Sequence, residues 1–351
     1  MLAPVTHILP LTTVRRERLL PVPGHLIARM EQKVAPLDVV ADANFGQEHI
    51  LFDVAQLLHV TPEVAKNMIQ CKVGDTVAAS QVIAQNKGLI PQVVKAPSPG
   101  KVILVGGGQV LLEIGETTIE LHAGMPGVVT RLIAERGVEI TFSGALVQGV
   151  WGNGRVDTGL ILPLMEKPED SLTSAMMDVS QRGSIILAGY CNDPAALQTA
   201  AELPARGLVL GSISPVLLPQ AAQLPFPVMV IDGFVQNPLN STAYKLLTTN
   251  AKREVTINAE AFDRYSGTRP ELFISLPVTQ EPPATREVET FAPNQSVRLV
   301  RAPHAGAVGT LLNLRPGQSV MPSGLRVPAA EVKLDSGEQV IVPLANLEVL
   351  G

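Results

Sequence analysis

The sequence is poor in aromatic and charged residues. Phe, Trp and Tyr make up 3% of the 351 residues, so the hydrophobic core must be built from Val, Leu, Ile and Ala. Charged residues make up 17% and hydrophobic residues 46%, a balance that excludes an intrinsically disordered chain. The formal net charge of -5 argues against a protein whose main partner is nucleic acid, because such proteins are usually basic.

Long hydrophobic runs are also absent. No segment approaches the roughly 20 apolar residues that a membrane-spanning helix needs. The opening residues lack the basic start and apolar centre of a signal peptide. The two cysteines, Cys71 and Cys191, lie far apart and fit reduced thiols. We therefore expect no membrane insertion and a cytoplasmic location.

Motifs of known enzymes are missing too. The six histidines are scattered, and the sequence holds no G-x-S-x-G, H-E-x-x-H or Walker pattern. The glycine-rich Val105–Val110 is followed by a strand pattern rather than a helix, so it predicts a hairpin turn and not a phosphate site. The sequence thus predicts no catalytic residue, no metal and no cofactor.

Glycine and proline, in contrast, are abundant, with 29 of each. They divide the chain into short segments, which is typical of many strands joined by turns. The length favours two or three domains. We predict a mainly β, multidomain protein with a central α/β domain.

Residues 1–165 repeat a short β pattern. Gly24–Ala43 and Cys71–Gly88 each predict strand, turn and strand, and the A-x-x-P-G-x-V pattern of Ala96–Val102 returns within Glu120–Gly154. A short helical insert is expected at 49–70, where Thr61-Pro62-Glu63 favours an N-cap followed by proline in the first turn.

Residues 178–277 change character, because strand patterns alternate with helical ones. This alternation predicts a small α/β domain with a parallel sheet and right-handed crossovers. The expected strands are 182–191, 206–213, 226–234 and 254–261, and the expected helices are 193–205, 214–224 and 240–253. A linker rich in Pro, Thr and Glu is expected at 278–296, and 297–351 predicts a compact β-barrel.

Val73–Val102, with "VGDTVAASQVIAQ" and "VVKAPSPGKV", resembles the barrel-sandwich hybrid of biotinyl and lipoyl domains. It is most similar to the version in the C subunit of Rnf-type electron-transport complexes, although Ser80 stands where that family usually has Gly. The resemblance implies a lysine on an exposed hairpin. Lys87 lies near that place, but its neighbours and its spacing differ from the carrier pattern.

The C-terminal part resembles the KOW module of NusG-like transcription factors and some ribosomal proteins. The resemblance is carried by "VRAPHAGAVGTLLNL" at Val300–Leu314 and "AEVKLDSGEQVIVPLANLEVL" at Ala330–Leu350. It implies an SH3-like barrel that contacts RNA or protein.

Polar residues that follow the predicted strands of the α/β domain form the first candidate site. In parallel sheets such residues line the usual ligand crevice. The set comprises Ser212, Ser214, Asp232, Gly233, Asn237, Arg264, Arg269 and Glu271. It predicts an anion or partner pocket, and the alternative is ordinary helix capping by Ser214 and Asn240.

The second candidate surrounds the single tryptophan, in "GALVQGVWGNGRVDTG" (Gly144–Gly159). Gln148, Trp151, Asn153 and Arg155 would form a binding surface. The alternative is a β-hairpin whose tight turn is formed by Asn153 and Gly154.

We expect a non-enzymatic scaffold or adaptor that binds a protein partner or assembles with itself. One alternative is RNA binding in transcription or translation through 297–351. It requires one face to gather the basic residues Arg298, Arg301, Arg315, Arg326 and Lys333. Another is an enzyme or small-molecule binder that uses Asp232 and Arg269 in the α/β domain.

Overall fold

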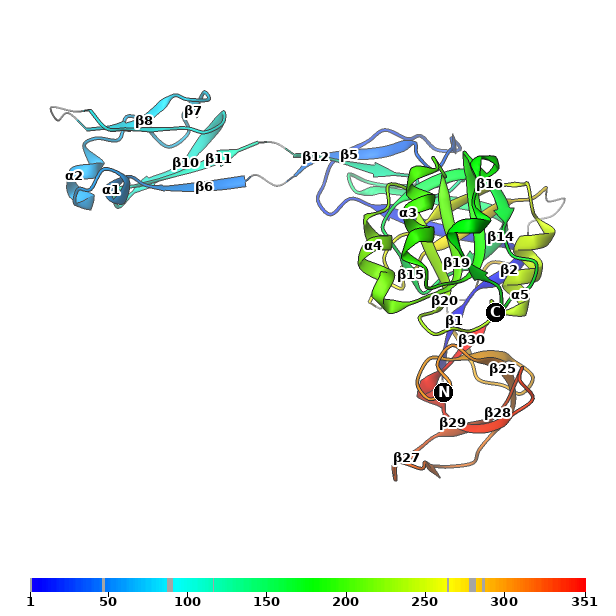
Figure 1. Cartoon of the computed structure of the whole chain (residues 1–351). Coiled ribbons are helices and arrows are strands. Elements are labelled where there is room, and N and C mark those ends of the chain that lie inside the picture. The colour runs from blue at the N-terminus through cyan, green and yellow to red at the C-terminus, as the bar shows by residue number, and fades with distance from the viewer. Residues whose placement is uncertain are drawn as a thin grey trace.

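The computed structural model describes residues 2–45, 48–86, 91–115, 117–263, 265–277, 282–285 and 288–351. The chain is mainly β, as predicted, and its strands form several sheets. Figure 1 shows a small unit that stands away from the rest, a central body, and a β unit that holds the N-terminus, with the C-terminus where this unit meets the body.

Parallel strands and helices alternate in the central body. The strand order β20-β19-β18-β16 is parallel throughout. Hydrophobic clusters lie on both faces, one against α3 and α4 and the other against α5. These elements are β16 (Val156–Pro163), β18 (Ser184–Cys191), α3 (Pro194–Glu202), β19 (Gly207–Ile213), α4 (Leu218–Gln223), β20 (Val228–Gly233) and α5 (Ser241–Thr249).

Helices α3 and α5 begin where their capping residues predict, whereas α4 begins only at Leu218, after the 3-10 turn Pro215–Leu217, and Ser214 makes no side-chain cap bond. The Asp193 carboxylate accepts a hydrogen bond from a backbone N–H in the first turn of α3, and Asn240 does the same for α5. Each side chain satisfies a donor that has no partner within its helix.

The sheet of the body is mixed rather than purely parallel. Strand β21 (Glu254–Asn258) runs antiparallel to β16, and Lys252, with φ 65°, lies in the turn between α5 and β21. The Lys252 N–H donates to the Ile161 carbonyl at 2.8 Å, so this turn lies beside β16. The sheet continues through β22 (Glu271–Ser275), β14 (Gly137–Gln148), β13 (Gly127–Ile133) and β4 (Lys33–Val34), and β2 (Ile8–Leu19) also pairs with β14.

The two chain ends lie in one seven-stranded sheet. Strand β1 (Leu2–Thr6) pairs in parallel with β30 (Leu347–Leu350), and Ala3 and Val5 are buried in the core of this sheet. The sheet also includes β23 (Val288–Thr290), β24 (Ser296–Leu299), β25 (Val308–Leu314), β28 (Ala329–Leu334) and β29 (Gln339–Pro343). The range expected to be a linker therefore contributes a strand, because β23 pairs with β1.

The hairpin predicted around Trp151 is wrong. Strand β15 (Trp151–Gly152) pairs with β20, whereas β16 pairs with β18 and β21. Gly152 allows this path, because a Cβ atom there would lie 2.2 Å from the Ala259 carbonyl oxygen. The glycines thus carry the chain across the body instead of folding it back on itself.

Residues 48–114 form a separate unit, which we call the arm module. Two short helices lie within the range 49–70 that was expected to be helical, but its first residues belong to strand β6. The predicted glycine turn lies between β10 and β11, and the buried residues of the core all lie between Val54 and Ile114. Its elements are β6 (Glu48–Asp53), α1 (Val54–Leu57), α2 (Pro62–Lys66), β7 (Thr76–Val77), β8 (Val82–Gln85), β9 (Val93–Lys95), β10 (Gly100–Gly106) and β11 (Gln109–Ile114).

A two-stranded stalk connects the arm module to the body (Figure 1). The stalk consists of β5 (Val39–Phe45) and β12 (Thr117–His122), which pair antiparallel. Beyond it, β6 and β11 pair along their whole lengths. The remaining short strands are β3 (His25–Leu26), β17 (Ser171–Leu172), β26 (Ser319–Val320) and β27 (Arg326–Val327), and short 3-10 turns lie at Ser174–Met176, Val179–Gln181, Pro215–Leu217 and Leu344–Asn346.

The repeat detected in the sequence is a structural repeat. The β10–β11 hairpin of the arm corresponds to the β13–β14 hairpin of the body, and each carries a β-bulge at the same place. The bulge falls between Val102 and Leu104 in the arm and between Val129 and Arg131 in the body. A third strand pairs antiparallel with the second strand of each hairpin, β6 in the arm and β2 in the body.

Backbone hydrogen bonds repeat with the same spacing. The Gly74 N–H donates to the Val102 carbonyl at 2.8 Å, and the Glu31 N–H donates to the Val129 carbonyl at 2.9 Å. Two more backbone bonds recur in the same way. The Val102 N–H donates to the Asp75 carbonyl in the arm, as the Val129 N–H does to the Gln32 carbonyl in the body. The Ala96 N–H donates to the Gln81 carbonyl in the arm, as the Ala123 N–H does to the Asp38 carbonyl in the body. We call the matching part of the body, β2, β4, β5 and β12–β14, the base module.

One module is therefore inserted into the other. In the arm module, β8 and β9 form a hairpin. Strands β5 and β12 occupy the equivalent place in the base module, and the whole arm module lies between them. The insertion leaves the base intact, because its two strands remain paired up to Phe45 and Thr117.

Replacing 46–116 by Asn-Gly should preserve the rest of the fold, since this dipeptide closes a two-residue hairpin between paired strands. Thermal unfolding should stay cooperative, and the Tm should change by less than about 4 °C, the shift that about 1 kcal/mol causes in a chain of this size. Loss of cooperativity in calorimetry would show that arm and body depend on each other.

Candidate functional site

Three leucines lie in one row across the outer face of the arm sheet. Leu104 in β10 is paired with Leu111 in β11, which is paired with Leu51 in β6. Leu51 is 56% exposed and Leu104 is 51% exposed, and Leu111 between them is half-buried. Alternate residues such as Val102 and Leu112 are fully buried in the core. The outer face is thus apolar along this row, opposite the buried core face, and we call the three residues the leucine row.

The base module carries charges in the same positions. Arg131 is paired with Glu139 and Glu139 with Glu17, at the register positions that Leu104, Leu111 and Leu51 take in the arm. Arg131 forms ion pairs with both glutamates, at 3.2 Å to Glu139. Its side chain is 54% exposed and that of Glu17 is 49% exposed, so both rows have the same access to water.

The bulge residue beside the row shows the same contrast, apolar in the arm and polar in the base. Ile103 in the arm is exposed, and its counterpart Thr130 in the base is a polar residue whose hydroxyl bonds Glu139 and Thr141. This fold therefore does not require apolar residues on the outer face. Fully covering one leucine contributes roughly 1.5–3 kcal/mol, so covering the half-exposed ones would contribute about half of that each.

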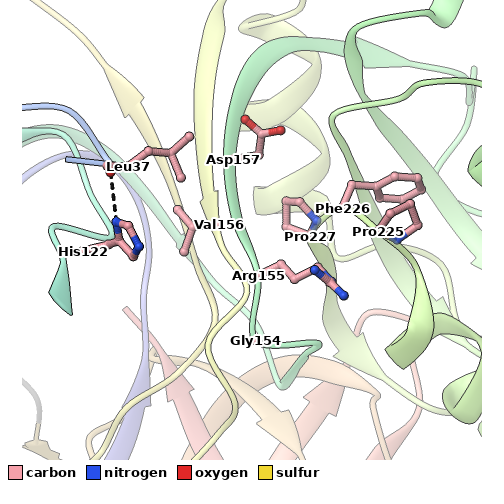
Figure 2. A pocket seen from close by; sticks show the side chains of 9 residues that line it. All are labelled: Leu37, His122, Gly154, Arg155, Val156, Asp157, Pro225, Phe226 and Pro227. Carbon is pink, nitrogen blue, oxygen red and sulfur yellow. Dashed lines mark hydrogen bonds between the residues drawn. The ribbon is translucent and has the colours of Figure 1, made fainter. Parts of the chain in front are cut away.

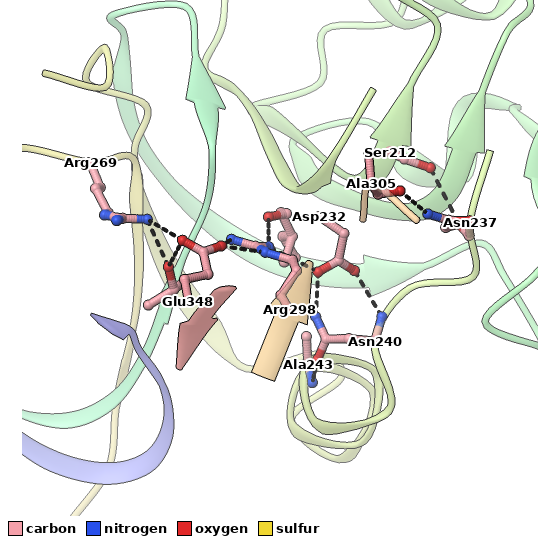
Figure 3. Close-up of polar contacts among 11 residues, drawn as sticks. Ser212, Asp232, Asn237, Asn240, Ala243, Arg269, Arg298, Ala305 and Glu348 are labelled. Atoms are coloured by element: carbon pink, nitrogen blue, oxygen red, sulfur yellow. Dashed lines mark hydrogen bonds and ion pairs between the residues drawn. The ribbon is translucent and has the colours of Figure 1, made fainter. Parts of the chain in front are cut away.

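The first candidate site of the sequence analysis is a buried polar junction between the body and the C-terminal sheet (Figure 3). Asp232 accepts hydrogen bonds from the Asn240 backbone N–H at 2.8 Å and from its side-chain amide at 2.7 Å. Arg298, on β24 and 1% exposed, pairs with Asp232 at 3.2 Å and with Glu348 on β30. It also donates to the Ile231 carbonyl at 2.8 Å.

This junction covers the carboxyl edge of the parallel strands, where α/β sheets usually bind ligands. The Asn237 amide donates to the Ala305 carbonyl at 3.1 Å, and the Ser212 hydroxyl donates to the Asn237 carbonyl at 3.3 Å. Burial raises the pKa of Asp232, and the adjacent Arg298 guanidinium opposes that rise. The predicted polar residues thus meet, but they bond to one another and to the C-terminal sheet.

Four other residues of the first candidate set are accounted for separately. Arg269 donates to the Thr6 hydroxyl at 2.7 Å and lies over the Phe262 ring, and burial lowers its pKa. Ser214 precedes a 3-10 turn without a side-chain cap bond, and Gly233 has φ 136°. Arg264 lies outside the described residues, as does Lys87.

A second polar chain lies beside the junction. Glu271 accepts hydrogen bonds from Arg16 at 2.6 Å and from the Gln148 amide at 2.9 Å. The Gln148 carbonyl oxygen accepts from the His7 backbone N–H at 2.9 Å. The His7 ring is buried, and its Nδ1 has no partner among the described residues. Burial, with repulsion from Arg16, lowers the pKa of His7 to about 4 against an opposing effect of Glu271.

The second candidate set is dispersed. Gln148 belongs to the polar chain just described, and Trp151 packs half-buried against the core beneath α3 and α4. Asn153 is used structurally, because its amide donates to the Phe226 carbonyl at 2.9 Å and accepts from the Val228 N–H at 3.0 Å.

Arg155 lines a cleft of about 340 Å³ between the base of the stalk and the body (Figure 2). His122 and Leu37 lie on the stalk side, and Asp157 on the body side is paired with Arg206. The volume is at the lower end for small-molecule sites. Of the predicted set, only Arg155 is near this cleft.

The basic residues of 297–351 do not all lie on the surface. Arg298 is buried in the junction, and Arg315 pairs with Glu331 at 3.0 Å. Arg301, Arg326 and Lys333 are exposed. The RNA-binding alternative requires one exposed basic face that includes Arg298, and Arg298 is buried.

Other chemistry has little support in the described part of the chain. It holds no group of three or more His, Cys, Asp and Glu that could bind a metal ion. Cys71 and Cys191 are free and buried, and burial raises the pKa of Cys191 to about 11, so this thiol stays protonated at neutral pH. No described helix is both long and apolar enough to cross a membrane.

Compared with known protein families and with curated proteins, the chain matches none. The leucine row was missed by the sequence analysis, although its signal is present. The strands around Val105–Val110 are apolar at successive positions, whereas the corresponding strands of the other repeat are each interrupted by one charged residue, Arg131 and Glu139. Aligning the two repeats residue by residue would have exposed the difference.

Replacing Arg298 with Met should lower the free energy of unfolding by about 3–5 kcal/mol, because two buried carboxylates lose their partner. The matched control is Arg315→Met at the exposed pair with Glu331, which should cost less than about 1 kcal/mol. Urea unfolding measures both. Equal losses would contradict a buried junction.

Stability should fall between pH 6.5 and pH 4 because of His7. In this interval the unfolded chain binds a proton at this residue and the folded chain does not, so unfolding is favoured as the pH falls. From pH 7 to pH 4 the parent protein should lose about 3 kcal/mol more unfolding free energy than the His7→Asn variant. Exposed His25→Asn is the control, and a parallel pH course for both variants would refute the assignment.

Proposed function

We propose that this protein is a non-enzymatic adaptor that binds another protein molecule through the leucine row of its arm module. The observation that carries this proposal is the difference between the two modules. The same row of the same sheet holds an ion-paired Glu17–Arg131–Glu139 in the base and three leucines in the arm.

The contrast supports binding because exposed apolar residues in a contiguous row are unusual on a monomer. Single exposed leucines are common and need no explanation, whereas adjacent exposed leucines that a matching sheet of the same chain does without support an interaction site. The base module is an internal control for what this sheet tolerates in water. The arm module departs from it at all three positions.

The position of the arm supports the same function. Figure 1 places the arm at the far end of the stalk, with its sheet clear of the body. A partner can therefore approach the outer face of β6, β10 and β11 without meeting the rest of the chain. The helices α1 and α2 pack in the core of the arm, on the face of the sheet opposite the leucine row.

The other candidate functions have less support. The carboxyl edge of the parallel strands, which an enzyme of this topology would use, is occupied by Arg298 and the loop at Ala305. The RNA-binding alternative depends on a basic face to which Arg298 does not contribute.

We assign the arm and base modules to the barrel-sandwich hybrid type and the C-terminal sheet to the KOW-like type as part of this proposal. The support is the sequence resemblance at Val73–Val102 and in the tail, together with the repeated register of the two modules. A cytoplasmic location is consistent with two free, buried cysteines.

The test transfers the row of the base module to the arm. Leu51→Glu, Leu104→Arg and Leu111→Glu together recreate Glu17, Arg131 and Glu139, so the variant should fold with unchanged circular dichroism. Immobilised parent protein should retain a protein from native lysate, and nuclease treatment should not release it. The triple variant should retain at least about 100-fold less, a difference of about 2.8 kcal/mol in binding free energy.

The matched control makes the same charge changes at exposed leucines elsewhere, Leu160→Glu, Leu314→Arg and Leu325→Glu. Binding should survive in this control. Retention that is equal in the folded row variant and the parent would overturn the proposed site, and loss of the retained material on nuclease treatment would favour the RNA alternative.

A further inference from the structure

We infer that the partner on the leucine row is a second copy of this chain, docked face to face and antiparallel. The inference rests on the proposed function, because it names the partner of the same surface. It is carried by the rows on either side of the leucines and by the direction of the stalk.

The two flanking rows have different chemistry. Lys101, Glu113 and His49 lie in register on the stalk side of the leucine row. On the far side the register positions are Gly106, Gln109 and Asp53, and the Gln109 amide donates to Asp53 at 3.0 Å. The surface is therefore apolar in the middle, with a mixed-charge edge and an acidic, amide-bearing edge.

A two-fold axis along the leucine row makes these edges complementary. It places each leucine against its own counterpart and each stalk-side row against the other copy's far-side row. His49 then faces Asp53 of the other copy, and Glu113 faces Gln109, whose amide can donate to it. An axis along the strands would instead place Glu113 against Glu113, and opposed like charges disfavour docking.

The stalk selects the same axis. Strands β6 and β11 follow β5 and precede β12 in the chain, and their paired ends at Glu48 and Ile114 are the ends nearest the stalk, so the body lies off one end of the arm sheet (Figure 1). Rotation about the leucine row sends the two bodies to opposite ends of the paired arms. Rotation about the strand direction would bring the bodies together at one end. The antiparallel dimer is therefore the one that leaves both bodies unobstructed.

The interface is small, because it consists of the outer face of one short sheet from each copy. Stable complexes usually bury about 800 Å² on each partner. We expect a Kd of about 1–100 µM. Sedimentation equilibrium of the full chain between about 1 and 300 µM should therefore show a monomer–dimer equilibrium.

The row variant described above should weaken dimerisation at least 100-fold, and the control with changed leucines elsewhere should not. A parent protein that stays monomeric at about 300 µM would overturn this inference. The proposed function would then be decided separately by lysate retention. Dimers that persist unchanged in the folded row variant would overturn both, since they would use another surface.

A charge exchange tests the orientation. Gln109→Glu should weaken the dimer about 5- to 10-fold, because the new carboxylate faces Glu113 of the other copy and cannot donate to Asp53 of its own chain. Adding Glu113→Lys should restore the Kd to within about 3-fold, since the introduced carboxylate of one copy would then meet the introduced ammonium group of the other. Failure of the second change to rescue the first would exclude the antiparallel axis, because within one chain these positions are four residues apart along β11 and separated by the leucine row.

Discussion

Arg298 joins the C-terminal sheet to the body. It lies on β24, is almost completely buried, and pairs with Glu348 on β30 and with Asp232 at the end of β20. A buried guanidinium without partners would be too costly to keep, so these carboxylates must lie beside it in the folded chain. The result is that the C-terminal sheet, which also contains the first strand, covers the carboxyl edge of the parallel strands. The edge at which such sheets commonly bind ligands is used here for internal packing.

With that edge covered, the arm is where two sheets of matching register can be compared, and there the outer face carries leucines that the base module does not have. The insertion of one module into the hairpin of another places the arm at the end of the stalk. The base module shows how this sheet faces water, with Arg131 between Glu17 and Glu139. The arm keeps the backbone, the bulge and the register but replaces the three charged residues with leucines. Since the backbone is the same in both, we attribute the change to binding, and we propose a second copy of the chain as the partner.

Local signals in the sequence were sufficient for many elements. Pro62 in the first turn marked the start of α2, although the Thr61 side chain makes no cap bond. Asp193 and Asn240 marked the starts of α3 and α5, because a cap depends on neighbouring residues only. Pairing between distant segments was not predictable in this way. Nothing near Leu2–Thr6 indicates that it pairs with Leu347–Leu350, and Asn153-Gly154 suggested a hairpin that the pairing of β15 with β20 replaces. Arg298 resembled a surface cation for the same reason, since its partners lie 50 and 66 residues away. The leucine row became visible only when the registers of the two modules were compared.

Small-angle X-ray scattering across a concentration series tests the central claim most directly, because mass and shape are obtained together. If the arms pair antiparallel through the leucine row, the scattering mass should approach twice the monomer mass at high concentration. The pair-distance distribution should then gain a second maximum at long distance, from two bodies held apart by their arms. A monomer mass at every concentration, or a dimer whose bodies lie side by side in a compact particle, would contradict the account.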